Sequence, residues 1–427
     1  MTRRKSFGVP AIVCDAEKLS QVAIIQELGH FGIPVVALSS NSSAIGFASK
    51  YVAQRILSPV ASYDPAYIDF LKSSVPPGVL FYSNDACTEN ISQNRDDLIS
   101  AGFFLLISHI STLGRVIEKD QLYRTGRECG ISVPECSLVD SVDEVQQRVA
   151  EYGLPVILKA TNLAGGVYRR IDDCKDVTAA FQEMRTLLAS PDHRHRSAHL
   201  MVQRWISQPG RKLWNFNACV QSGEILSFVT GERIRSDHYP DGRLGSILLF
   251  GKTEHNCRIH ELNSRLLRHL QFDGLVETEW SEDPAGEGET FLYDFNPRPS
   301  GNIRWSFKSG VSLALQYYEL ALGLPPKLQE MKTGVAYAKV FYRWSDPIEA
   351  CVSRRFTFTQ KLSILKDDLL AVLRCRRHAV DILDPRDLGP TWYATGELAR
   401  FLLRRFRQRI SRVLYAVSIF PRLRPVQ

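Results

Sequence analysis

The sequence predicts a protein of mixed α/β and α+β class that begins with a doubly wound parallel sheet. Short apolar strands alternate with helical stripes through residues 9–107, which favours a parallel sheet with crossover helices. Later strands come in adjacent pairs joined by turn residues, as expected for antiparallel hairpins. The 427 residues suffice for two or three domains.

The first domain is expected to cover residues 1–112. Its predicted strands are Val9–Cys14, Ile33–Leu38, Val52–Leu57, Val79–Tyr82 and Phe103–Ile107, and its predicted helices are Glu17–Phe31, Asp64–Ser73 and Glu89–Ser100. The first strand–helix turn contains no glycine, so no dinucleotide-binding fingerprint is present. Ser83-Asn84-Asp85 follows a strand at the sheet edge where such folds bind ligands. A helix-entry turn capped by Asp85 or Thr88 explains it equally well.

Composition and charge narrow the functional classes. Apolar residues make up 44% and charged residues 23%, as in ordinary globular proteins. The nine cysteines form no CxxC pair, and the chain shows neither a secretory signal nor an 18-residue apolar run, so we expect a cytoplasmic protein. Residues 397–427 hold eight arginines and one acid, which equals the net charge of +7 of the whole chain. The body therefore gives no electrostatic reason to expect nucleic acid as a partner.

An acidic hairpin is predicted over Gly274–Asn296. Period-two alternation in Gly274–Trp280 places Glu277 and Glu279 on one face. In Phe291–Asn296 the same alternation places Leu292, Asp294 and Asn296 on one face of the strand. The other face holds Phe291, Tyr293 and Phe295. The oxygens of Glu279, Asp294 and Asn296 suit Mg²⁺, with Mn²⁺ as an alternative, and Arg298 could reach a phosphate. The other interpretation is two edge strands with solvated polar faces.

Basic and small residues precede this hairpin. Lys119 lies on a predicted helix, Val116–Glu128, and Lys159 ends the apolar strand Val156–Lys159. The following loop contains Gly165-Gly166, which could bring backbone N–H groups close to a phosphate. Snorkelling of Lys159 and a plain hairpin turn at the glycines are the alternatives.

Further strands are predicted at Leu200–Ile206, Leu213–Gln221 and Ile225–Val229, followed by a helix at Glu261–Leu270. Arg233 and Arg235 follow the predicted strand Ile225–Val229 and, at a spacing of two residues, share one face. They are either site residues or part of an exposed strand face. Residues 331–427 match no catalytic pattern. They contain a predicted strand, Val335–Trp344, helices at Lys361–Arg376 and Gly396–Ser418, and a loop at Asp384-Pro385 and Gly389-Pro390. The Arg-rich last helix could meet an anionic membrane or an acidic protein, or simply cover the core.

These motifs, in this order over Val9–Pro326, resemble the ATP-grasp superfamily, particularly its carboxylate–amine ligase branch. The resemblance is carried by Lys119 before Gly130-Ile-Ser-Val-Pro134, Pro155-Val-Ile-Leu-Lys159 before Gly165-Gly166, Val202-Gln-Arg-Trp-Ile206 before Gly210, Glu279, and Asp294-Phe-Asn-Pro-Arg298. It implies a pre-ATP-grasp α/β domain (1–112), a two-lobed ATP-grasp domain (113–330) and a C-terminal helical extension (331–427). The lid lobe would cover about 135–198 and the C-terminal lobe about 199–330.

The resemblance also implies residue roles. Lys119 and Lys159 would touch nucleotide phosphates, under a loop with Gly165 and Gly166. The hinge around Gln203, Trp205 and Ile206 would bind adenine, and Glu279, Asp294 and Asn296 would hold Mg²⁺, with Asp294 standing where the family usually has Glu. Arg298, with Arg233 or Arg235, would contact the transferred phosphate.

The implied function is an ATP-dependent ligase that activates a small carboxylate as an acyl-phosphate, releases ADP and couples the acyl group to an amine. The residues leave two other functional classes open. One is a nucleotide-binding regulatory protein without catalytic activity. The other is a scaffold recruited through residues 397–427 to the surface of a membrane or to an acidic protein.

Overall fold

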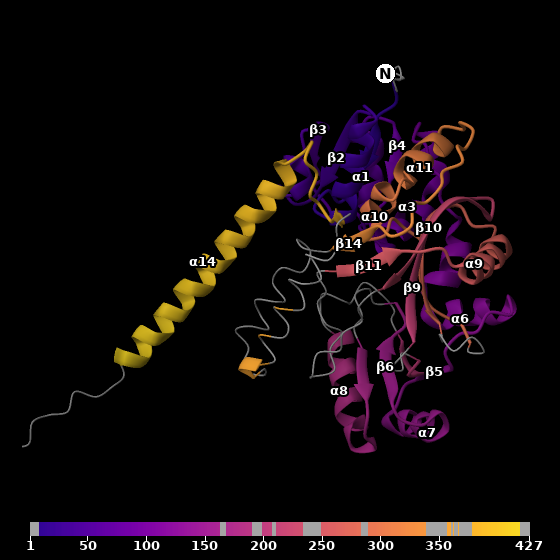
Figure 1. Ribbon diagram of the computed structural model, residues 1–427, viewed down its shortest axis with the longest axis vertical. Coiled ribbons are helices and arrows are strands. Elements are labelled where there is room, and N and C mark those ends of the chain that lie inside the picture. Colours follow the sequence, from indigo (N-terminus) through magenta and orange to yellow (C-terminus); the bar gives the residue numbers. More distant parts are fainter. Residues whose placement is uncertain are drawn as a thin grey trace, which may run out of the picture.

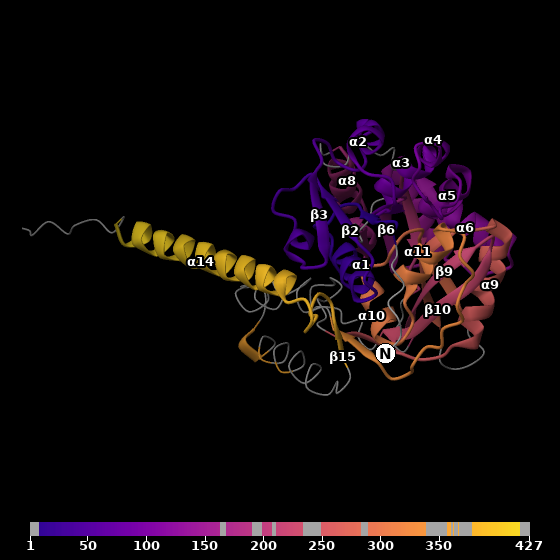
Figure 2. The same ribbon diagram turned by 90° about the horizontal axis from the view of Figure 1, so that it is seen from above.

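The computed structural model describes residues 8–162, 168–189, 199–206, 211–233, 249–282, 289–338, 357–359, 362, 366 and 378–418. Three sheets follow one another along the long axis in Figure 1. The N-terminal sheet lies at the top, the largest sheet in the middle and a small lobe at the bottom. A long helix, α14, projects from the upper body, and the perpendicular view in Figure 2 shows it pointing away from the other elements.

The N-terminal sheet is parallel, with strand order β3-β2-β1-β4. Its strands are β1 (Ala11–Val13), β2 (Val35–Ser39), β3 (Val52–Leu57) and β4 (Val79–Phe81); its helices are α1 (Leu19–His30), η1 (Ile45–Ala48), α2 (Ala66–Ser74), α3 (Asp85–Gln93) and α4 (Arg95–Ser100). The doubly wound prediction is confirmed. The prediction of a single helix over 89–100 is wrong, because the helix is interrupted at Asn94 and α3 and α4 take its place.

The fifth strand predicted at Phe103–Ile107 is also wrong. Only Phe104 forms a bridge, to Val79. The next backbone groups bond to the middle of the molecule instead: the Leu106 N–H lies 3.4 Å from the hydroxyl of Tyr317, and the Ser108 N–H donates to the carbonyl of Asp273 (3.0 Å). This segment therefore ties the first domain to the central sheet.

The lid lobe has its own antiparallel sheet, order β5-β8-β6-β7, and its own apolar core. Its elements are β5 (Cys136–Val139), α7 (Val142–Tyr152), β6 (Val156–Ala160), β7 (Tyr168–Ile171), η2 (Cys174–Asp176), α8 (Val177–Leu188) and β8 (Leu200–Arg204). Two helices lead into it, α5 (Ile110–Ile117) and α6 (Lys119–Glu128). One helix was predicted there; Glu118 is extended and separates the two, so Lys119 is the first residue of α6.

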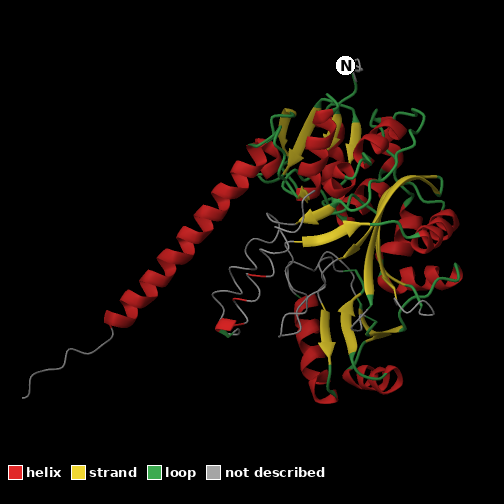
Figure 3. Ribbon diagram, viewed as in Figure 1, coloured by secondary structure: helices red, strands yellow, loops and turns green. Residues whose placement is uncertain are grey.

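The central sheet has seven strands in the order β13-β12-β9-β10-β11-β14-β15. Figure 3 shows strands in yellow in the middle of the molecule. They are β9 (Lys212–Gln221), β10 (Glu224–Arg233), β11 (Leu249–Thr253), β12 (Gly274–Glu282), β13 (Phe291–Asn296), β14 (Ala336–Ala338) and β15 (His378–Val380). The β9–β10 hairpin turns at Ser222 and Gly223, both with positive φ (48° and 77°), as a two-residue turn requires.

Strand alternation gives the central sheet two different faces. Even-numbered residues such as Phe216 and Val276 pack on α5, α6 and α9 (Cys257–Leu270). Odd-numbered residues such as Cys219 and Leu275 pack with α10 (Ile303–Lys308), α11 (Leu313–Ala321) and the core of the first domain. The part of this odd-numbered face that lies away from Cys219, towards the lid lobe, carries the polar residues of the candidate site.

The C-terminal region begins within the body, and its last helix projects from it. β15 pairs in parallel with β14, and α14 (Gly389–Ser418) begins at the Gly389-Pro390 pair that was predicted to be a loop. Apart from residues 362 and 366, the helix predicted at Lys361–Arg376 lies outside the described residues, as does most of the strand predicted at Val335–Trp344. None of the described helices combines the length and hydropathy needed to cross a membrane.

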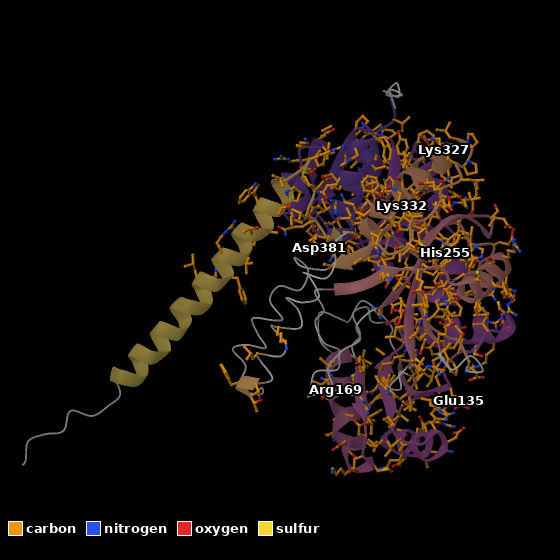
Figure 4. All side chains as sticks on the ribbon, viewed as in Figure 1. Glu135, Arg169, His255, Lys327, Lys332 and Asp381 are labelled. Carbon is orange, nitrogen blue, oxygen red and sulfur yellow. The ribbon has the colours of Figure 1, made fainter. Side chains whose placement is uncertain are left out.

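Residues 381–389, here called the C-terminal clasp, join β15 to α14 and begin at Asp381, labelled in Figure 4. Arg304 of α10 is 2% exposed and donates to the side-chain oxygen of Gln26 (2.6 Å) and the carbonyl of Leu383 (2.5 Å). The carboxylate of Asp387 accepts from the Ser49 hydroxyl (2.6 Å) and from Gln26 (3.2 Å). The clasp therefore connects α10 with α1 and the η1 turn of the first domain.

Candidate functional site

The predicted acidic residues meet on the odd-numbered face of the central sheet. The strand β13 contributes even-numbered residues to this face, because they pair with odd-numbered residues of β12. Glu279 lies opposite Asp294 on one side and Asn215 on the other. One step along, Glu277 lies opposite Asn296. The structure therefore brings Glu279, Asp294 and Asn296 together, as the alternation predicted.

A β-bulge in β13 changes the rest of that pattern. Asp294 pairs with Glu279, but the next paired residue is Leu292, opposite Trp280, so Tyr293 is extra. Leu292 consequently joins Phe295 in the apolar core, and Tyr293 turns its hydroxyl towards the polar face. The predicted faces of Leu292 and Tyr293 were wrong because simple alternation assumes a strand without a bulge.

Two cations compensate the paired carboxylates. Lys119, at the start of α6, donates to Asp294 Oδ1. Arg233, the last residue of β10, donates to Glu279 Oε2 and to the Tyr293 hydroxyl, both at 3.1 Å. Burial alone would raise the pKa of Asp294, but the Lys119 ammonium, followed by Lys159 and Arg298, holds it below its ordinary value. Asp294 is therefore an ionised carboxylate at neutral pH.

Lys159 is a partly buried lysine at the base of the lid lobe. Its ammonium donates to the hydroxyl of Tyr123 (3.2 Å). That hydroxyl donates to the Gln203 side chain (2.8 Å) and lies 3.1 Å from the Tyr293 carbonyl. Burial, reinforced by the charge of Lys119, lowers the pKa of Lys159 to about 7. An amine of this kind gains its proton when a negative charge approaches.

The sequence interpretation missed Tyr123 and Tyr293, which link the lid lobe to the acidic face. The available signal for Tyr123 was its position four residues after Lys119, on the same side of α6. Glu277 was placed on the correct face but without a role. Its carboxylate accepts amide N–H groups from three directions, Asn215 (2.8 Å), Asn302 (3.0 Å) and Asn296 (3.3 Å).

Arg298 completes the site from the loop after β13. Its Nη2 donates to the Asn296 Oδ1 (2.9 Å), and its Nε donates to Asp85 Oδ1 (2.8 Å) in the first domain. Capping of α3 by Asp85 or Thr88 was the alternative for the Ser83–Asp85 turn, and it is wrong. Asn84 is the cap, with its side chain accepting from the Cys87 N–H (3.0 Å), so the Asp85 carboxylate faces Arg298.

Beside the acidic face, β10 and α10 approach closely at Gly231, which pairs with Asn215. A Cβ on Gly231 would lie 2.0 Å from the Trp305 ring, so only glycine fits there. Trp305 is held in place by its indole N–H, which donates to the Val335 carbonyl (2.8 Å). The packing of α10 on the sheet thereby fixes where the Pro297–Asn302 loop, with Arg298, crosses the site.

The remaining predicted residues are placed only in part. Gln203 lies in β8 and is 3% exposed, and Ile206, just after that strand, is 9% exposed. Trp205 packs against the Arg170 guanidinium, 4.9 Å from the ring centre. Gly165, Gly166 and Arg235 lie outside the described residues, so the predicted phosphate-covering loop stays a prediction.

The oxygen ligands at this site fit a hard divalent cation only when other oxygens, from phosphate and water, complete the coordination. In the part of the chain that the structure describes, no three His, Cys, Asp or Glu side chains gather as a metal site. Glu279 and Asp294 face each other across one strand pair, and the Asn296 oxygen, which accepts one bond from Arg298, has a second lone pair. Two carboxylates completed by phosphate oxygens and water are a usual environment for Mg²⁺.

Comparisons with known proteins agree with this architecture. No family model matches the chain, and no curated protein matches it in sequence. Among solved structures, N5-carboxyaminoimidazole synthetase from Staphylococcus aureus matches with a TM-score of 0.56 at 13% identity, over 77% of this chain and 81% of that one. The chain has the ATP-grasp fold. The expected fold class is thereby confirmed.

Two biotin carboxylases give the same ATP-grasp match. The enzyme from Campylobacter jejuni, in a β-γ-ATP complex, has a TM-score of 0.58 at 15% identity over 76% of this chain and 74% of that one. The biotin carboxylase domain of the Hydrogenobacter thermophilus 2-oxoglutarate carboxylase, with MgADP, ADP and bicarbonate, has a TM-score of 0.57 at 15% identity over 76% and 72%. At such identities the likeness establishes the fold, and residue roles depend on the geometry above.

Proposed function

We propose that the protein is an ATP-dependent ligase that phosphorylates a substrate carboxylate and couples the acyl-phosphate to an amine. One observation carries the proposal: four cations from four segments of the chain, Lys119, Lys159, Arg233 and Arg298, surround the face that holds Glu279 and Asp294. Cations around paired carboxylates suit a bound Mg²⁺–nucleotide, because the carboxylates can bind the metal ion and the cations can bind the phosphates.

The chemistry needs little covalent help from the protein. A carboxylate is a poor acyl donor because its leaving group would be oxide, and phosphorylation replaces that group with phosphate. Phosphoryl transfer is catalysed by positioning and charge neutralisation. Lys119 and Lys159 would hold the nucleotide phosphates, and Arg298 with Arg233 would stabilise charge on the transferred group. A nucleotide-binding regulator without chemistry would have no need of Arg298 at that place.

Glu279 and Asp294 would hold Mg²⁺, with the Asn296 oxygen beside them. When bound, the ion would neutralise phosphate charge. In the structure described here Asp294 is bonded to Lys119 and Glu279 to Arg233. Nucleotide binding would give both cations phosphate partners and release the carboxylates for the metal. The site's own ion pairs would thus be exchanged for contacts with the ligand.

The products test this proposal. With a panel of small carboxylates and amines, including amino acids, we expect release of ADP and phosphate that depends on Mg²⁺ and is abolished by EDTA. Hydroxylamine should trap the acyl-phosphate as a hydroxamate. Asp294→Asn should lose this activity while the circular dichroism spectrum is unchanged. Release of AMP and pyrophosphate would show an adenylating enzyme and contradict the proposal.

Proton uptake tests the role of Lys159. With a pKa of about 7, this amine is about nine-tenths neutral at pH 8 and about nine-tenths charged at pH 6. Phosphates would raise its pKa, so we expect MgATP binding to take up a proton at pH 8 and far less at pH 6. Calorimetry in buffers of different ionisation enthalpy measures this. Lys159→Met should remove the difference; uptake that persists in this variant would assign the proton elsewhere.

Contact of residues 397–427 with an anionic membrane or an acidic protein stays a prediction, as does the cytoplasmic location. Two features support a surface role: α14 projects from the body in both views, and Leu403 is 59% exposed.

A further inference from the structure

The first domain reaches into the candidate site at one ion pair. Asp85 and Arg298 are 213 residues apart, and their carboxylate and guanidinium meet at 2.8 Å with side chains only 13% and 18% exposed. Asp85 is the first residue of α3, at the carboxyl end of β4. Because Asn84 already caps α3, the carboxylate of Asp85 is not needed by its own helix.

The guanidinium of Arg298 is held on several edges. Asp85 accepts from Nε, Asn296 accepts from Nη2 (2.9 Å), and the carbonyl of Pro299 lies 3.4 Å from Nη1. A guanidinium has five N–H donors. The contacts in the described part of the chain account for three, which leaves one N–H on each Nη. One N–H on each terminal nitrogen is enough to donate to two oxygens of a carboxylate or a phosphoryl group.

We propose that Asp85 is a positioning residue that holds the plane of the Arg298 guanidinium, so that its two remaining N–H groups meet the carboxylate or acyl-phosphate of the substrate. This inference rests on the proposed function. Asp85 itself does not touch the reacting atoms; it acts through Arg298. The proposed active site is consequently complete only when the Ser83–Asp85 turn of the first domain contacts the loop after β13 of the central sheet.

A spectroscopic test addresses the geometry without any substrate. The Nε–H signal of Arg298, identified by its loss in Arg298→Met, should exchange slowly with water because it is bonded to a carboxylate. Asp85→Ala should make that exchange markedly faster. Asp69→Asn is the matched control, since Asp69 also lies in the first turn of a helix, α2, but is 85% exposed. Unchanged exchange in Asp85→Ala would overturn the proposed contact.

A kinetic test uses a generic probe, because the natural acid is unidentified. Acetyl phosphate with MgADP should yield ATP and acetate: the P–O bond to the acetyl oxygen breaks, and a P–O bond to the ADP β-phosphate forms. We expect Asp85→Ala to lower kcat about 10–100-fold, the scale of a small misplacement of a catalytic group, with little change in the KM for MgADP. Asp85→Glu should recover part of the rate.

The double variant decides whether Asp85 acts through Arg298. In an Arg298→Met background, Asp85→Ala should cause no further loss of rate, since residues that act as one unit are not additive. Equal losses in both backgrounds, or a wild-type rate in Asp85→Ala, would overturn the positioning role. If Asp85→Ala does not fold, Asp85→Asn serves in both tests. If the wild type makes no ATP from acetyl phosphate while the exchange result holds, the proposed function fails and the contact stands.

Discussion

Arg298→Met is expected to lower kcat for acyl-phosphate formation by about 10²–10³, the usual effect of removing one preorganised charge stabiliser. The reason is geometric as well as electrostatic. The guanidinium is fixed by Asp85 and Asn296 before any ligand arrives, so no reorganisation is needed when charge develops. Hydroxamate formation measured under saturating ATP, with the acid found in the product screen, gives the rate.

Two controls make this result specific. Arg268→Met removes an exposed arginine that forms a two-point pair with Glu224, and it should leave kcat unchanged. Arg298→Lys keeps the charge but loses the planar fork, so it should recover only part of the rate. A wild-type kcat in Arg298→Met would remove this residue from the reaction.

Arg304→Met is expected to cause the largest loss of stability, about 3–5 kcal/mol in the free energy of unfolding, because breaking a buried charge arrangement leaves its partners uncompensated. Arg304 is almost fully buried, with Gln26, the Leu383 carbonyl and the Asp384 carboxylate (3.8 Å) around it. Urea unfolding followed by tryptophan fluorescence measures the change.

The same exposed pair serves as the reference. Arg268→Met removes a surface ion pair and should cost only about 0–1 kcal/mol. If Arg304→Met were as mild as Arg268→Met, the C-terminal clasp would contribute little to the stability of the body. Limited proteolysis after residue 378 should become faster in Arg304→Met alone.

Local periodicity was enough to predict the strands of the first sheet, the β9–β10 and β12–β13 hairpins and one face of the candidate site, but not β5, β7, β11 or β15. Glu277 and Glu279 alternate with apolar neighbours, so their common face could be read directly from β12. The bulge at Tyr293 could not, because a bulge depends on which backbone groups of the partner strand are available. The strand predicted at 103–107 does not continue past Phe104, because the N–H groups of Leu106 and Ser108 have their partners beyond residue 270.

Polar contacts between distant parts of the chain were the other feature that could not be predicted from the sequence. Nothing in the sequence near Asp85 or Arg304 indicates which buried group each will meet. Such pairs form where separate lobes are packed together, and the packing is set by hundreds of apolar contacts. Lys159 could be singled out because it ends an apolar strand before the Gly165-Gly166 loop, whereas Lys119 was singled out by the family resemblance. Tyr123 had no comparable signal beyond its helical spacing.

The C-terminal clasp also constrains how the protein can be made in a cell. Gln26 bonds to the Ile382 carbonyl and to Asp387, partners 356 and 361 residues further along the chain. While the ribosome is still synthesising the middle of the protein, α1 and α10 therefore present polar groups whose partners do not yet exist. The first domain should reach its final protection from protease only after residue 389 has left the exit tunnel, so we expect nascent chains stalled before that point to be held by chaperones.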